Sequence, residues 1–537
     1  MEGSGFAPYE VRITFYAAGI NGAVCSCPYE WGGWCKHIVA ALLAGIHEPE
    51  MVQELPALED ILSGLDWEQL KNVLLRLAER DSYLVDAIER EVSLLQTPPS
   101  EARHTTVDAT SIRHRVRAII RSLDYMRPSE AYWHVGGVVN EVCRVLDGAW
   151  AFIEAEDGRN TLVVLEAITD EYMDAWEWLD DSNGEVGEFF YDLGAAWTEA
   201  LLSVELAPRE REEWSGKLDA WWEELENYAG GESFDAALTA VKQGWDHPPL
   251  LRVLEGGVPE QEEEYYDDDL TVARLNVLER RERHEEYLRL ADYADQVARH
   301  AVMLIRLGRL EEAVEYGLKR LRTAEEALAV AESLREHEEP EPALQIGEHG
   351  LSLEGRKATL AVWVRDLASG MGERDRALEP AVTAFREDPS LASYLRVRDL
   401  AGERWPEYRS MLLDHLRREK SYHPVGHVEV FLHEGLIQDA IAAVERSPVG
   451  ALVEQVADAA VESHPDWVIG TCRRQAEEIM EQGKSQYYGK AIDWLTKAKA
   501  AYLVAGRRAE WRTYLSELII RHRRKYKLRP MLEDLAK

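Results

Sequence analysis

The sequence predicts a mainly α protein in which a small β-hairpin and helix at the N-terminus precede a long α-solenoid. Three observations lead to this fold class. Apolar and polar residues alternate over residues 9–16, which is the period of a half-buried strand. From Leu58 onward almost every segment spaces its apolar residues as a helix does. In the second half of the chain a helix-pair pattern recurs, as expected of stacked repeats.

The N-terminal module should contain two short strands and one helix. The segment YEVRITFY (9–16) places its apolar residues on one face and its polar residues on the other. Asn21-Gly22 accepts positive φ, so we expect it to turn the chain into a second strand at 23–25. Residues 37–46 repeat apolar positions every four residues, which predicts a helix directly after a cysteine-rich stretch.

The remaining sequence reads as helices separated by polar linkers. One expected linker, near 97–111, contains paired prolines. The other, 258–269, is an acidic run whose charges oppose packing. The predicted organisation is therefore a module at 1–50, a helical region at 51–257, the acidic linker at 258–269 and helical repeats at 270–537.

The repeats at 270–537 share a short polar turn followed by an alanine and an aliphatic residue that open a helix. The spacing of the first three alanines is 30 and 34 residues, close to the tetratricopeptide (TPR) period, and the later spacings are 63 and 51. A small residue at this position lets neighbouring helices approach closely, which predicts a TPR-like stack with a degenerate repeat. The alanines are Ala313, Ala343, Ala377, Ala440 and Ala491.

Composition restricts the classes of function. The chain of 537 residues has 61 basic and 99 acidic side chains and a net charge of −38, which repels nucleic acid unless a local basic surface offsets it. Of its five cysteines, Cys143 and Cys472 stand alone and are assigned to helix cores, so no secreted disulfide framework is indicated. With no signal peptide and no apolar run of about 18 residues, we expect a cytoplasmic protein that does not cross a membrane.

The segment CSCPYEWGGWCKH (25–37) carries a candidate metal site. Cys25, Cys27, Cys35 and His37 offer three thiolates and one imidazole, the ligand set of a closed tetrahedral zinc site. Residues i and i+2 of a helix point ~200° apart, so Cys35 should precede the helix, His37 should lie in its first turn and Lys36 should point outward. A redox dithiol, a thiol/disulfide switch and coincidental cysteines remain alternatives.

Four protein ligands would leave no open coordination position, so the zinc ion would be structural rather than catalytic. A module of this size needs a metal to fold, and we expect metal binding and folding to be one event. The sequence contains no HExxH, GxSxG or usable phosphate loop, and we expect a protein without enzymatic activity. An uncharacterised enzyme is the less favoured alternative, because a helical catalytic pocket need not carry a short motif.

The pattern CSCP, a short spacer and CKHIVAALLA, with the preceding strand, resembles the SWIM zinc finger. The resemblance implies zinc ligation by the four residues named above, and an interaction module for DNA or protein, found beside ATPases, transposases and helical repeats. It covers about a tenth of the chain. Met1 lies only eight residues before Tyr9, closer than in similar proteins, so we expect a short or misassigned start that leaves the outer strand edge unpaired.

The expected function is binding of a protein partner, such as an ATPase or another DNA-associated factor, by a finger presented on a helical-repeat body. The alternative is DNA or RNA binding through the finger and two basic segments. The first begins at Arg113; the second, RHRRKYKLR (521–529), either contacts phosphates or is a terminal capping helix with a polar outer face. The candidate nucleic-acid contacts are Lys36, Arg521, Arg523, Arg524, Lys525, Lys527 and Arg529.

Overall fold

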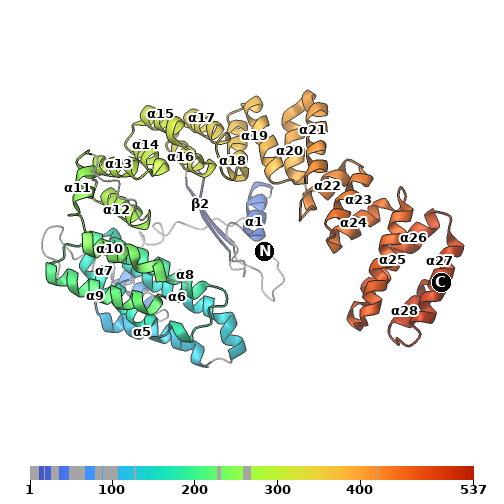
Figure 1. Ribbon diagram of the computed structural model, residues 1–537, viewed down its shortest axis with the longest axis horizontal. Helices are drawn as coiled ribbons and strands as arrows, with labels where there is room; N and C mark the ends of the chain where they lie inside the picture. Colours follow the sequence, from blue (N-terminus) through green and yellow to red (C-terminus); the bar gives the residue numbers. More distant parts are fainter. Residues whose placement is uncertain are drawn as a thin grey trace. The chain divides into compact units, whose positions relative to one another are not determined.

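The computed structural model, shown as a ribbon in Figure 1, describes residues 11–16, 19–25, 35–47, 67–78, 88, 107–125, 128–226, 231–257, 268–419 and 421–536. Contacts divide the chain into two units, residues 1–106 and 107–537. Among the described residues, no helix is long and apolar enough to span a membrane.

The first unit contains the expected hairpin and helix. Strands β1 (Val11–Tyr16) and β2 (Gly19–Cys25) pair antiparallel, and helix α1 (Lys36–His47) packs against both. Cys25 pairs with Val11 at the end of the hairpin. A second described helix, α3 (Trp67–Ala78), follows. The small sheet at the N-terminus is therefore confirmed.

The predicted position of the hairpin turn is wrong. Asn21 and Gly22 lie inside β2, and the chain reverses before Gly19. Thr14 pairs with Gly22 whereas Phe15 pairs with Ile20, so Asn21 is the additional residue of a β-bulge. An Asn-Gly pair suits a β-bulge as well as a hairpin turn, because a bulge and a turn both depart from regular strand geometry.

The described residues of the second unit form helices joined by turns, with one isolated β-bridge between Thr323 and Glu354. Its first part contains α5 (Ala109–Arg121), α6 (Pro128–Glu154), α7 (Gly158–Met173), α8 (Glu185–Ser203), α9 (Pro208–Leu225), α10 (Asp235–Gln243) and α11 (Pro248–Leu254), with short 3₁₀ turns η2 (Ser122–Tyr125), η3 (Trp176–Trp178) and η4 (Gly231–Phe234). Helix α5 begins inside the segment expected to be a linker, where the side chain of Asp108 caps it by accepting a hydrogen bond from the Thr110 amide.

The repeat region begins at α12. Its helices are α12 (Asp268–Arg280), α13 (His284–Tyr293), α14 (Val297–Arg306), α15 (Leu310–Arg320), α16 (Ala324–Glu336), α17 (Pro340–Gly350), α18 (Ala358–Gly370), α19 (Arg374–Glu387), α20 (Leu391–Ala401), α21 (Trp405–Arg418), α22 (Val425–His433), α23 (Ile437–Arg446), α24 (Gly450–Ala460), α25 (Pro465–Gln482), α26 (Tyr488–Val504), α27 (Arg508–Arg521) and α28 (Leu528–Leu535), with η5 (Gly402–Arg404) and η6 (Ser485–Tyr487).

Each helix of this region packs on its neighbours along the chain. Consecutive helices form antiparallel pairs, as in α16 with α17, α18 with α19 and α25 with α26. Alternate helices also meet, as in α14 with α16 and α22 with α24, so that one pair stacks on the next. This arrangement confirms the mainly α fold class with a helical-repeat body.

Eight turns between consecutive helices share one backbone geometry. A residue with positive φ ends the first helix, and the amide after it donates to a carbonyl five residues back. At Glu338, for example, φ is 62° and the Glu339 amide donates to the Leu334 carbonyl at 3.0 Å. The turn residues are Glu156, Glu282, Asp295, Gly308, Glu338, Gly372, Gly435 and Gly506.

The alanines of the sequence pattern lie in the core, four of them at a fixed distance from a turn residue. Ala313, Ala343, Ala377 and Ala440 each follow a turn residue by five positions. These four and Ala491 are fully buried, with no exposed surface. Their burial agrees with a small residue packed between neighbouring helices.

The helices before the repeats bury a tryptophan cluster. Trp197 has no exposed surface; its ring lies 5.1 Å from that of Trp214 and 5.5 Å from that of Trp221, and its indole N–H donates to Thr169. Trp197 and Trp221 are core residues, and Trp214 is partly buried beside them. Trp178 differs from them, because 87% of it is exposed.

Candidate metal centre

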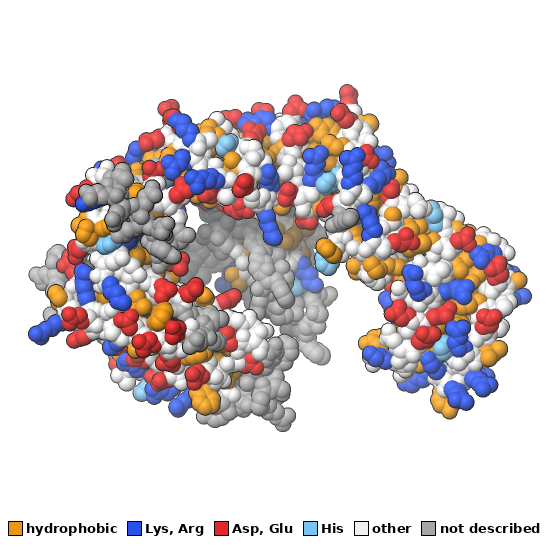
Figure 2. Space-filling view, viewed as in Figure 1, with side chains coloured by type: hydrophobic (Ala, Val, Ile, Leu, Met, Phe, Trp, Pro, Cys, Tyr) orange, Lys and Arg blue, Asp and Glu red, His pale blue; other side chains and the backbone are white. Residues whose placement is uncertain are grey.

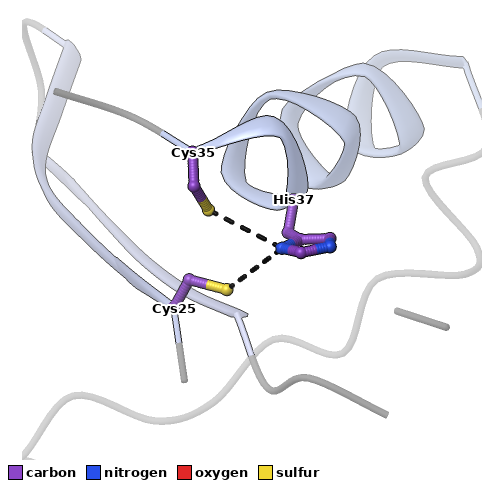
Figure 3. Close-up of side chains that lie close together, drawn as sticks. All are labelled: Cys25, Cys35 and His37. Atoms are coloured by element: carbon purple, nitrogen blue, oxygen red, sulfur yellow. Dashed lines mark hydrogen bonds between the residues drawn. The ribbon is translucent and has the colours of Figure 1, made fainter. Parts of the chain in front are cut away.

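Three of the four predicted ligands lie together in the first unit (Figure 3). The Nδ1 atom of His37 lies 3.8 Å from Cys25 Sγ and 3.9 Å from Cys35 Sγ. The three ligand atoms all lie within 4.8 Å of one another. Cys27 lies outside the described residues, so its predicted ligation stays a prediction.

The positions of the ligands follow from the local fold. Cys25 ends β2, and its alternation with exposed Val24 turns the thiol to the side of the hairpin that faces α1. Cys35 directly precedes α1, and its carbonyl accepts from the Val39 amide in the first helical turn. His37 lies in that turn and is buried, whereas Lys36 is exposed, as the spacing predicts.

The arrangement fits a zinc ion. Around tetrahedral zinc, with zinc–sulfur and zinc–nitrogen distances of ~2.3 and ~2.0 Å, sulfur and nitrogen lie ~3.5 Å apart. The observed separations are longer by a few tenths of an ångström. Two thiolates and an imidazole are ligands that zinc prefers and magnesium or calcium does not. Cys25, Cys35 and His37 can therefore hold zinc, which would fasten the end of the hairpin to the start of α1.

Sequence analysis did not identify which imidazole nitrogen faces the thiols. In the structure it is Nδ1, the nitrogen nearer the backbone. The spacing C-x-H at a helix start favours this geometry, because the ring must turn back toward Cys35 over a short distance.

The two isolated cysteines have a different environment. Burial raises the pKa of the Cys143 thiol to about 11 and that of Cys472 to about 12. A thiol with so high a pKa is neutral and unreactive at physiological pH. Cys472 has no exposed surface, which confirms its assignment to a helix core, and Cys143 is half-buried on α6.

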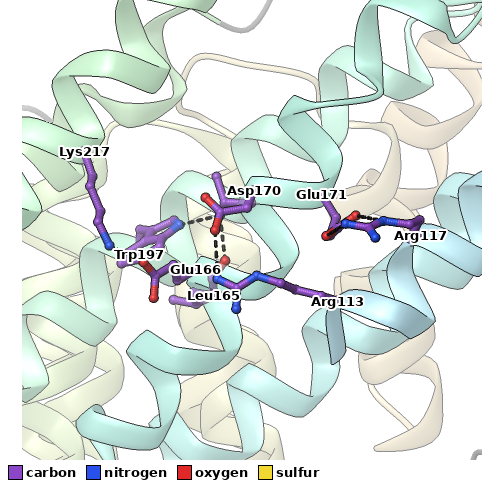
Figure 4. A network of polar contacts seen from close by, with 9 residues as sticks. Arg113, Arg117, Leu165, Glu166, Asp170, Glu171, Trp197 and Lys217 are labelled. Atoms are coloured by element: carbon purple, nitrogen blue, oxygen red, sulfur yellow. Dashed lines mark hydrogen bonds and ion pairs between the residues drawn. The ribbon is translucent and has the colours of Figure 1, made fainter. Parts of the chain in front are cut away.

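The first basic segment considered for nucleic-acid binding is paired within the protein (Figure 4). Arg113 on α5 donates to Asp170 on α7 at 2.8 Å. Arg117 donates from Nε and Nη2 to Glu171, at 2.7 and 2.5 Å, and the Glu171 side chain is only 6% exposed. These two arginines join α5 to α7, so their charges are already compensated.

The candidate contacts of the C-terminal segment divide into two groups. Arg521 donates to Glu477 and Arg529 to Glu533, and Lys525 donates to the Met480 carbonyl. The other three, Arg523, Arg524 and Lys527, are exposed. Lys36, the remaining candidate, lies on the finger in the first unit.

Comparison with known proteins identifies the N-terminal module. Residues 9–46 match the family model of the SWIM zinc finger. The match contains the hairpin, the cysteines and α1, and the chain therefore carries a SWIM zinc finger, a family that implies zinc binding, joined to a helical-repeat body.

Two solved structures are similar to long parts of the chain. The TPR domain of P58(IPK) is 13% identical, with 75% of this chain and 96% of that chain covered and a TM-score of 0.15. A circular tandem repeat protein with novel repeat topology is 15% identical, with 80% and 93% covered and a TM-score of 0.16.

Proposed function

We propose that the protein is a cytoplasmic, non-enzymatic scaffold whose helical repeats bind protein partners. In this proposal the SWIM finger is folded around one structural zinc ion held by Cys25, Cys27, Cys35 and His37. The geometry of Cys25, Cys35 and His37 supports the metal site, and the stacked helix pairs support the binding role. A stack of helix pairs offers extended surfaces that suit a segment of another protein.

One observation carries the binding role. A groove of about 640 Å³ lies between α18 and α20, with α19 as its floor. Six of its ten lining residues are alanine, serine or threonine, whose small side chains leave space between the helices. The lining residues are Ala358, Thr359, Val362, Arg365, Ala384, Asp388, Ser390, Ala392, Ser393 and Arg396.

The lining also indicates the chemistry of the partner. Val362 is 39% exposed and offers an apolar contact. Arg365 is neutralised by Asp366, to which it donates twice at 2.8 Å. Arg396 donates to the Ser369 hydroxyl, and no carboxylate of the described residues is paired with it. The groove therefore suits a protein segment with an apolar side chain for Val362 and a carboxylate for Arg396.

Site-specific cross-linking tests this function. A photoreactive residue replaces Val362, and the cells that make the protein are irradiated. We expect a discrete cross-linked protein. Its yield should fall about tenfold in Arg396→Glu, because the new carboxylate repels the partner carboxylate that Arg396 attracts. Ala392→Phe fills the groove and should abolish the cross-linked product.

Matched controls keep the experiment specific. Arg335→Glu makes the same charge change at an exposed position of α16, and Ala509→Phe adds the same ring at an exposed position of α27. Neither should change the yield. Cross-links that survive both groove variants, or no cross-linked protein at all, would contradict partner binding at this groove.

A further inference from the structure

The C-terminal end of the helical stack combines uncompensated cations with exposed apolar side chains. Helix α27 ends at Arg521, and the residues between it and α28 carry Arg523, Arg524 and Lys527. No group of the described residues pairs with these three side chains. In Figure 2, Lys and Arg side chains gather over the end of the chain that α27 and α28 form.

The backbone holds this segment firmly in place. Leu528 and Leu532 of α28 have no exposed surface, and His522 is 5% exposed. Lys525 points inward, where it donates to the Met480 carbonyl and lies 6.0 Å from the centre of the Tyr488 ring. The segment is anchored by these residues, so the three exposed cations project from a fixed scaffold.

The buried histidine reports the local electrostatic field. Burial lowers the pKa of His522, and the positive charges of Lys525 and Arg521 lower it further, against Glu481 and Glu477. Positive charges therefore act on His522 at this end of a chain whose overall charge is −38.

A cap that only keeps the stack soluble does not explain the aromatic residue. Tyr526 is 92% exposed and stands between Lys525 and Lys527, and Ile520 is 67% exposed. A solubilising cap needs a polar outer face, and an exposed ring adds apolar surface to it. Cations beside an exposed ring suit a phosphate backbone with unstacked bases.

We propose that this cationic cap, made of Arg523, Arg524, Tyr526 and Lys527, binds single-stranded nucleic acid. The three cations contact phosphates, and a base stacks on the Tyr526 ring. The contact is independent of base sequence, because neither phosphates nor the face of a ring distinguish one base from another. This binding site is separate from the groove between α18 and α20 and does not depend on it.

Fluorescence anisotropy with the full chain and a labelled 20-nucleotide RNA or DNA strand tests the proposal. Three phosphate contacts to a single strand predict binding about twentyfold weaker at 200 mM than at 50 mM salt. The triple variant Arg523→Ala, Arg524→Ala, Lys527→Ala should lose most of the affinity and most of this salt dependence. Tyr526→Ala should weaken binding about tenfold with the salt dependence unchanged, because stacking is not an ionic contact.

A control variant removes three exposed cations elsewhere, by Arg335→Ala, Arg356→Ala and Arg418→Ala. It makes the same change in net charge and should bind as the unmodified protein does. Circular dichroism checks that α27 and α28 remain folded in each variant. An equal loss of affinity in the two triple variants would overturn the proposal, as would the absence of binding at 50 mM salt. Binding of polyglutamate as tightly as the nucleic acid, with no effect of Tyr526→Ala, would also overturn the proposal. Such a result would favour an acidic protein partner.

Discussion

The carboxylate of Glu199 on α8 lies 2.6 Å from the guanidinium of Arg280 on α12, and the two side chains are 6% and 21% exposed. The other oxygen of Glu199 accepts a hydrogen bond from Asn276 at 2.6 Å. Helices before and after the acidic segment are therefore joined by a buried ionic contact. Such a contact requires both partners, because a buried charge without its counterpart is strongly destabilising.

We expect Glu199→Gln to destabilise the helical unit by about 3 kcal/mol, because it leaves the Arg280 charge uncompensated in a mostly buried place. Thermal and urea unfolding followed by circular dichroism would measure the change. Glu315→Gln removes a carboxylate from the exposed pair with Lys319 and serves as control; it should produce no measurable change. An equally small effect of both variants would show that the buried pair does not hold the two parts together.

The shared turn geometry predicts opposite effects for two substitutions at equivalent positions. Glu338 adopts φ of 62°, which costs a residue with a Cβ about 1 kcal/mol. Glu338→Gly should therefore stabilise the protein by up to about 0.5 kcal/mol, because the entropy cost of glycine offsets part of the relieved strain. At Gly372, with φ of 84° and open space around an added Cβ, Gly372→Ala should destabilise by about 1 kcal/mol.

Denaturant unfolding of the two variants in parallel checks this prediction. Glu336→Gly, in regular helix two residues before the turn, is the control for adding a glycine and should destabilise. Stabilisation by both glycine substitutions, or by neither, would disagree with backbone strain at Glu338.

Much of the fold could be predicted because local sequence and packing agree. The alanines at 313, 343 and 377 revealed the repeat, because each follows a polar turn near the start of a helix and is fully buried. The residue with positive φ in each turn was harder to predict from the sequence. Glu282, Asp295 and Glu338 occupy the same conformation as Gly308, but their side chains carry no signal for positive φ.

Other features depend on residues far apart in the sequence. The ion pair of Glu199 with Arg280 joins two helices across the acidic segment, and no spacing rule predicts it. For the same reason the basic segment at Arg113 appeared available for phosphates, although Asp170 and Glu171 compensate it in the structure. The metal ligands were predictable because a short loop brings their types together at fixed spacing.

Removal of a metal ligand should unfold the finger and leave the helical unit folded. Elemental analysis by inductively coupled plasma mass spectrometry should find one zinc ion per chain in the purified protein. His37→Ala should lower this ratio severalfold, because three ligands hold zinc poorly. Since contacts divide the chain between Thr106 and Val107, the unfolding temperature of the helical unit should not change.

Cys143→Ser is the control, because that thiol lies outside the site and should leave the zinc content unaltered. Limited proteolysis should cut residues 11–47 rapidly in His37→Ala and slowly in Cys143→Ser. A rigid finger without zinc would contradict the coupling of metal binding to folding.

His300 gives the protein a defined response to acid. Its ring stacks on Tyr316 at 4.2 Å, and Nδ1 lies 2.9 Å from the Leu288 carbonyl, to which it donates. Burial lowers the pKa of this imidazole, against the opposing effects of the Leu288 hydrogen bond and the Asp292 carboxylate. The folded protein therefore holds His300 neutral at a pH where the unfolded chain would bind a proton.

Stability from this group is present above the unfolded pKa of about 6.5 and is lost as the pH falls toward the lower folded value. We expect His300→Phe, which keeps a ring against Tyr316, to reduce the loss of unfolding temperature between pH 7 and pH 5. His423→Phe replaces an exposed histidine and should leave that loss unchanged. A pH response of His300→Phe that equals the unmodified protein would exclude His300 as its source.

The common turn has a consequence for how the molecule can evolve. Eight joints share this turn, and in four of them a fully buried alanine follows five positions later, so a segment copied from one of these four joints to another carries its own buried contact with it. Gly308, Glu338 and Gly372 mark such joints 30 and 34 residues apart. Duplication or loss of one such segment would change the reach of the protein while leaving both the finger and the final helices intact.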